Sequence, residues 1–148
     1  MDESLNVYIQ KFMAANEALR RKMAMDYRKL NEQRGIGITG PQFFMLHFIK
    51  EQGQCKLTQL AEKMEVKPSA ITVMIDRLVH ANLVARIHDP HDRRVVLVEL
   101  TQEGQQALDQ LKDLTKEIIA RYFSGIGKEE LARFVATFEK LAGMTDKH

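Results

Sequence analysis

The sequence predicts a mainly helical α+β fold, with six helices and one β-hairpin in the order α-α-α-α-β-β-α-α. Hydrophobic residues recur three or four positions apart near both ends of the chain, which is the period of an amphipathic helix. Between these regions, two short β-prone runs flank the polar segment 89–94, which is the pattern of a hairpin. With 148 residues, the chain is long enough for one hydrophobic core but not for two independent ones.

A long first helix is predicted from its apolar stripe, which the segment Gly35–Gly37 ends. The stripe consists of Leu5, Tyr8, Phe12, Leu19, Met23, Tyr27 and Leu30. The second helix begins at a capping box, in which Thr39 caps the helix and Gln42 reaches back, with Pro41 in the first turn. Gly53 ends it.

The third helix is predicted over Leu57–Met64 and is followed by a tight turn at Glu65. Pro68 opens the fourth helix, which continues to about Ala81. Asn82 follows in the left-handed conformation that ends many helices. The predicted pair of short helices with a minimal turn is typical of a helix-turn-helix.

Two strands and two helices complete the chain. The strands are predicted at Leu83–His88 and Val95–Leu100. Thr101 caps the fifth helix, and Gly125 and Gly127 separate it from the last one. The apolar faces of these two helices consist of Leu108, Leu111, Leu114, Ile118 and Tyr122, and of Leu131, Phe134, Val135, Phe138 and Leu141.

The fourth helix carries a second face that suits the major groove of DNA. Short donors and acceptors can bond base edges, and a β-branched methyl group can contact thymine. The face consists of Ser69, Thr72, Val73 and Asp76. Pro68 and Ser69 lie at the helix N-terminus, where free amides favour a phosphate. The alternative interpretation is an ordinary amphipathic helix of a bundle.

The hairpin carries arginines at Arg86, Arg93 and Arg94. An arginine on a narrow projecting loop can enter the minor groove. Asp92 is predicted to hold an arginine in one rotamer, either Arg94 or, across the hairpin, Arg86, which lowers the entropy lost on binding. The alternative is a solvated turn with a surface ion pair of little energetic value.

Six segments of the chain share their order and spacing with one family of bacterial regulators. They are Leu57–Met64, Lys67–Thr72, Asp76–Leu78, Asn82–Val84, Asp89–Arg94 and Leu100–Gly104. With these segments in this order, the sequence resembles the MarR family over essentially its whole length. The resemblance implies a sequence-specific regulator of double-stranded DNA, a ligand-responsive repressor that binds a pseudo-palindromic operator as a homodimer.

The resemblance also implies that different regions of the chain bind DNA and form the dimer. Residues 38–101 would form a winged helix-turn-helix DNA-binding lobe, and residues 1–37 and 102–148 a helical dimerisation region. By position, the DNA contacts are Ser69 and Thr72 on the recognition helix, Arg94 on the wing with Asp92 bracing it, and Arg77 near a phosphate. Val73 departs from the family, because many members carry a basic or polar reader there, and Asn82 replaces the usual glycine.

A small aromatic effector is a further implication of the resemblance. Tyr27, Phe44, His47 and Phe48 are the candidate lining residues, with a core position as the alternative for each. The dimer has a physical argument of its own, since the apolar stripes of the terminal helices exceed what a slim monomer would bury. The alternative is that these stripes close on the winged lobe of the same chain.

Composition limits the remaining function classes. The net charge of +2 permits DNA binding without establishing it. A single cysteine, Cys55, and the absence of a long apolar run or signal pattern favour a cytoplasmic protein outside the membrane. No enzyme motif or cofactor-binding loop is present, so we expect neither. A helical protein-interaction module and a metal-dependent enzyme centred on His88 and His91 are the competing hypotheses.

Overall fold

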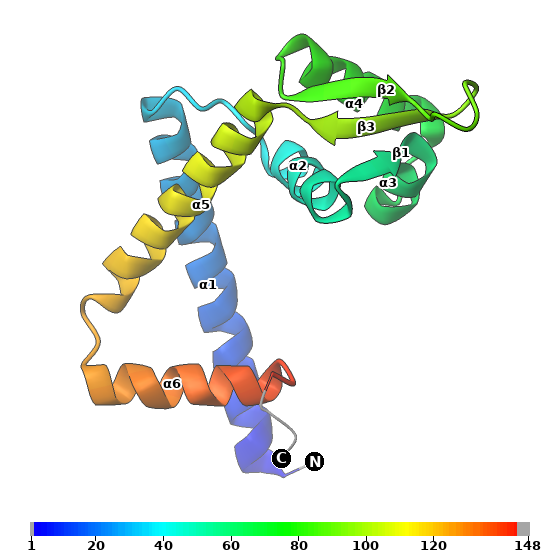
Figure 1. The fold of residues 1–148 in the computed structure, drawn as a ribbon. Helices are drawn as coiled ribbons and strands as arrows, with labels where there is room; N and C mark the ends of the chain where they lie inside the picture. Colours follow the sequence, from blue (N-terminus) through cyan, green and yellow to red (C-terminus); the bar gives the residue numbers. More distant parts are fainter. Residues whose placement is uncertain (1, 145–148) are drawn as a thin grey trace. The chain divides into compact units, whose positions relative to one another are not determined.

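The computed structural model describes residues 2–144 (Figure 1). Its elements are α1 Glu3–Gln33, α2 Gly40–Gln52, β1 Gln54–Lys56, α3 Leu57–Met64, α4 Pro68–His80, β2 Val84–His88, β3 Val96–Leu100, α5 Gln102–Phe123 and α6 Lys128–Leu141. The predicted class, six helices with a hairpin between the fourth and fifth, is confirmed.

The chain forms two compact units, to which α1 and α5 both contribute. The winged unit comprises residues 28–114, and the helical unit combines the described residues up to Tyr27 with those from Thr115 onwards. The predicted dimerisation region includes residues 1 and 145–148, which lie outside the described part of the chain.

The winged unit contains an antiparallel sheet of three strands in the order β1-β3-β2. Val98 on β3 pairs with Cys55 on β1 and with Arg86 on β2. The β2–β3 hairpin was predicted, but the predicted order lacked β1. A three-residue strand is too short to show an alternating pattern, and it forms here because β3 offers it a backbone ladder.

Helix ends in the winged unit follow local sequence signals. Gln42 N donates to Thr39 Oγ1 at 3.3 Å and Thr39 N donates to Gln42 Oε1 at 3.0 Å, which confirms the capping box. Asn82 has the predicted left-handed conformation, with φ 59°, and so does Glu65 in the turn between α3 and α4, with φ 54°. Thr101 Oγ1 accepts a bond of 3.0 Å from Gly104 N at the start of α5.

One core connects the helices of the winged unit to its sheet. Its fully buried side chains are Met45, Leu46, Ile49, Leu60, Ile71, Ile75, Leu78, Val84, Val98, Leu108, Leu111 and Leu114. Because these residues come from α2, α3, α4, α5, β2 and β3, close packing fixes α4 against the hairpin strands. The loop between β2 and β3 projects from the end of the sheet (Figure 1).

The helical unit contains a hydrogen bond between α1 and α5 and an aromatic cluster. Tyr122 Oη donates to Asp26 Oδ2 at 2.5 Å, and this bond raises the pKa of the Tyr122 hydroxyl. Phe134 meets Phe123 edge to face at 6.1 Å between ring centroids and stacks on Phe138 at 5.8 Å. Within the described residues, no helix is both long and apolar enough to cross a membrane.

Candidate nucleic-acid interface

The helix-turn-helix of the winged unit comprises α3 and α4. Their facing sides bury Leu60, Ala61, Ile71, Ile75 and Leu78, as predicted, while Val66 in the turn is half-buried. Val66 N donates to the carbonyl of Ala61 at 3.1 Å, so the turn is tied back to α3. The inner face of α4 is therefore fully committed to packing.

The outer face of α4 is open to solvent. Ser69, Thr72, Val73 and Asp76 are all exposed, together with Pro68 and Arg77. Thr72 Oγ1 donates to the carbonyl of Pro68 at 3.0 Å, which leaves its oxygen available as an acceptor. The residues predicted to meet base edges are accessible, and their contact with DNA remains a prediction.

Asp76 on this face is paired with Arg86 on β2. From the sequence, Arg86 was a possible partner of Asp92, and Asp76 was expected to face the groove. The structure joins Arg86 to Asp76 instead, because β2 packs beside α4. The pairing offsets a carboxylate charge that would otherwise repel phosphate groups.

At the hairpin tip, Asp92 holds Arg94 by three bonds. Asp92 Oδ1 accepts from Arg94 N at 3.0 Å and from Nε at 3.1 Å, and Oδ2 accepts from Nη2 at 3.3 Å. The side-chain bond to Arg94, followed by the backbone bond, lowers the pKa of the Asp92 carboxyl. The Arg94 side chain is nevertheless 91% exposed. The predicted contact between Asp92 and Arg94 is confirmed. It fixes the orientation of the Arg94 guanidinium group, which remains exposed to solvent.

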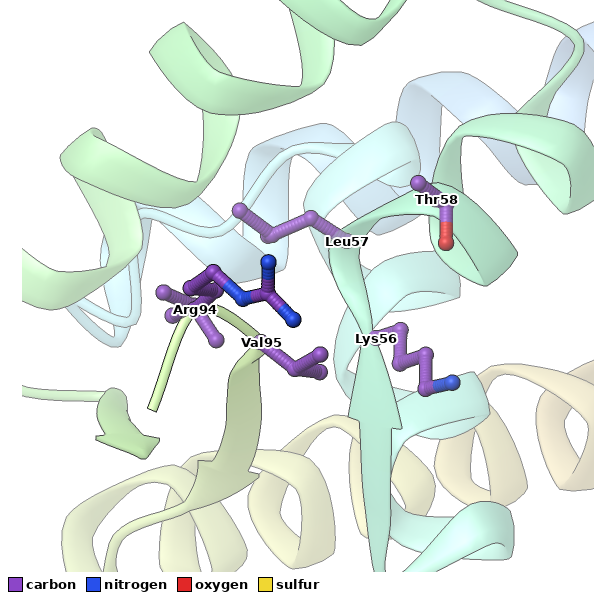
Figure 2. Close-up of a pocket in the computed structure, with 6 residues that line it drawn as sticks. Lys56, Leu57, Thr58, Arg94 and Val95 are labelled. Carbon is purple, nitrogen blue, oxygen red and sulfur yellow. The ribbon is translucent and has the colours of Figure 1, made fainter. Parts of the chain in front are cut away.

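A pocket of about 340 Å³ lies between the hairpin and the start of α3 (Figure 2). Its lining consists of Lys56, Leu57, Thr58, Arg94, Val95 and Val96. Two cations and a hydroxyl around an aliphatic floor suit a sugar-phosphate backbone. Lys56 and Thr58 were not predicted as contacts, although they stand at the N-terminus of a predicted helix, where free amides favour a phosphate.

Two further polar contacts lie within the hairpin. Asp89 Oδ1 accepts from His91 N at 2.7 Å, and His88 Nδ1 lies 3.2 Å from the carbonyl of Arg93. No cluster of three or more His, Cys, Asp or Glu suited to a metal ion occurs among residues 2–144. Arg93 is exposed, as a DNA contact would require.

Comparison with known proteins agrees with this geometry. The model of the MarR family matches residues 38–96, which include the helix-turn-helix and most of the hairpin. The HTH-type transcriptional repressor MdtR of Bacillus subtilis is 40% identical over 126 residues, covering 85% of this chain and 80% of MdtR. The chain belongs to the MarR family.

Solved structures of MarR proteins share the fold. The YusO protein of Bacillus subtilis is 36% identical, with a TM-score of 0.80, covering 93% of this chain and 96% of YusO. A mutant MarR from E. coli, solved in complex with operator DNA, is 27% identical, with a TM-score of 0.61, covering 90% and 95% of the two chains. MarR relatives are named as transcriptional regulators and not as enzymes.

The four candidate effector residues of this MarR chain have different environments. Phe44 is exposed, whereas Tyr27, His47 and Phe48 are half-buried. His47 Nδ1 lies 3.6 Å from Glu51 Oε1, and Lys63 Nζ lies 6.0 Å from the centroid of the Phe48 ring. None of the four lines the pocket beside the hairpin, so their role in ligand binding stays a prediction.

The single cysteine of this MarR chain is part of the sheet. Cys55 is 1% exposed and sits at the middle of β1. Burial raises the pKa of its thiol to about 11, so the thiol is protonated at neutral pH. A protonated, buried thiol is a poor nucleophile, which fits a structural role.

Proposed function

We propose that this chain is a cytoplasmic, homodimeric repressor that binds a pseudo-palindromic operator in double-stranded DNA. Two features of the winged unit carry the proposal. The outer face of α4 is exposed and has short side chains, and Arg94 is exposed while Asp92 holds it in place. The first suits the major groove, and the second suits the minor groove beside it.

The DNA contacts divide by chemistry. Ser69, Thr72 and Val73 meet base edges, since their side chains are short and exposed. Arg94 enters the minor groove with Arg93 beside it, and Arg77 contacts a phosphate from the side of α4. The structure also leads us to add Lys56 and Thr58 as backbone contacts, because they line the pocket that Arg94 shares.

The homodimer in this proposal is built by the helical unit. Large hydrophobic side chains are exposed along it, among them Leu5, Tyr8, Phe12, Met13, Met25, Phe134, Phe138 and Leu141. An apolar groove of about 320 Å³ lies between α1, α5 and α6, lined mainly by Leu19, Met23, Ile119, Tyr122, Phe123, Phe134, Val135 and Phe138. So much exposed apolar surface disfavours a monomer, and a second copy would cover it on a two-fold axis.

The proposed repressor responds to a small aromatic ligand. Phe44 and His47 lie three residues apart on α2, so they share a side of that helix. Exposed Phe44 and the imidazole of His47 would stack on and bond to a small aromatic effector, with Phe48 as a further contact from the same helix. A thermal shift induced by phenolic compounds, lost in Phe44→Ala, is the expected signature.

DNA binding is tested on the promoter region that precedes the chain's own gene. Fluorescence anisotropy with 30-base-pair fragments should find one fragment bound about 10³-fold or more tightly than random duplex DNA. Affinity should fall linearly with the logarithm of salt concentration. Equal affinity for all fragments, together with a stable protein partner on purification, would instead favour the helical interaction module.

A further inference from the structure

Val73 is the most exposed large hydrophobic side chain of the winged unit. Across residues 28–114, all of which the structure describes, only Phe44 and Val73 among the large hydrophobic residues are exposed, at 43% and 52%. A β-branched residue gains little in a helix without burial. Val73 stands midway along the outer face of α4, so its methyl groups are presented where the proposed function places the bases.

Two polar side chains beside Val73, those of Thr72 and Asp76, are already engaged within the protein. The hydroxyl proton of Thr72 is bonded to the Pro68 carbonyl, so Thr72 offers an acceptor and a methyl group. Asp76, one turn further along α4, is bonded to Arg86. The centre of the face therefore presents methyl groups and acceptors, and its exposed donors, Ser69 and Arg77, lie one helical turn to either side of Val73.

The chemistry of the major groove identifies the base that fits this surface. Thymine alone among the four bases carries a C5-methyl group there, and apolar side chains recognise it by contact. Resting on the proposed function, we propose that Val73 is a specificity-determining residue that reads thymine through its C5-methyl group. Each half of the operator then contains a thymine opposite Val73, and cytosine at that position leaves the methyl groups of Val73 facing a polar edge.

Replacement of thymidine by deoxyuridine isolates this contact, because it removes the methyl group and keeps the base pair. Binding sites are first selected from random duplex DNA with the full chain. Each thymine of a half-site is then replaced in turn, and the Kd is measured by fluorescence anisotropy. For the wild-type chain, replacement at one particular thymine of each half-site should raise the Kd about four-fold, the value expected for one buried methyl group, and replacement at the other thymines should not.

Two variants locate the effect. Val73→Ala should bind the thymine and deoxyuridine duplexes with nearly equal affinity at that position, while Val73→Ile restores the difference. Arg94→Ala, the control, should weaken binding to both duplexes by the same factor, because Arg94 is on the hairpin. Circular dichroism checks that each variant is folded.

The outcomes separate this inference from the function on which it rests. If selection yields no preferred sequence, the proposed function fails. If a preferred sequence is found but no deoxyuridine replacement changes the Kd, or Val73→Ala keeps the four-fold difference, thymine reading by Val73 is wrong and the proposed function stands.

Discussion

The carbonyl of Leu83 occupies the space that a side chain at position 104 would need. A Cβ atom on Gly104 would overlap the Leu83 carbonyl oxygen and lie 2.9 Å from its carbon. The same oxygen accepts a bond of 3.1 Å from Thr101 N. This close approach joins the residue that precedes β2 to the first turn of α5.

Gly104→Ala should therefore destabilise the fold. The added methyl group forces a backbone shift at the base of the hairpin, with an expected loss of about 1–3 kcal/mol in the free energy of unfolding. Gly125→Ala is the matched control, because nothing lies within 4 Å of its added Cβ. Chemical denaturation should show the control unchanged or slightly more stable, and equal stability of the two variants would contradict the packing described.

Asp92→Ala tests whether the carboxylate prepares Arg94 for DNA. Without its bonds to Asp92, Arg94 must be ordered on binding, so we expect an affinity loss of up to about ten-fold, the entropy of one long side chain. A carboxylate that merely repelled DNA would give the opposite sign, with tighter binding in the variant. In an Arg94→Ala background, Asp92→Ala should not lower the affinity for DNA further. Anisotropy titrations of the two single variants and the double variant would measure this.

Phe138→Glu tests the proposed dimer. A charge placed in the apolar groove of the helical unit should shift the protein from a dimer to a monomer of 17.0 kDa. Thr137→Glu is the control, since it adds the same charge on α6 at an exposed residue outside the groove lining. Sedimentation equilibrium measures the mass of each variant. A wild-type chain that sediments as a monomer would contradict the proposed dimer.

Cys55 should be unreactive in the folded protein. Because burial raises the pKa of its thiol to about 11, the thiolate is scarce between pH 7 and 9. Ellman's reagent should label Cys55 only after unfolding in guanidinium chloride. Since the folded thiol holds its proton more tightly than the unfolded one, its contribution to stability is complete below pH 9 and declines between pH 9 and 11. Rapid labelling of the native chain at pH 8 would show that β1 opens readily.

Features set by neighbouring residues were predictable from the sequence. The capping box of Thr39 and Gln42, the left-handed Asn82 and the Asp92–Arg94 pair each depend on residues within three positions or on one backbone conformation. The bounds of α3 and the start of α4 at Pro68 agree with the prediction for the same reason.

Features set by distant residues were not predictable from the sequence. β1 exists because Cys55 meets Val98, 43 positions later, and three residues carry no periodic signal. Asp76 pairs with Arg86 because β2 lies beside α4, which makes a predicted groove contact into an ion pair. Lys56 joins Arg94 at one pocket only after the hairpin has folded against the start of α3.

Hydroxyl-radical footprinting of the selected operator tests whether the hairpin enters the minor groove, because it reports minor-groove contacts along the duplex. We predict two protected minor-groove segments, symmetric about the operator centre and outside two recognition sites about one helical turn apart. Arg94→Ala should remove the outer protection and leave the dimer bound. Protection that is absent, or unchanged in Arg94→Ala, would contradict a DNA-binding wing.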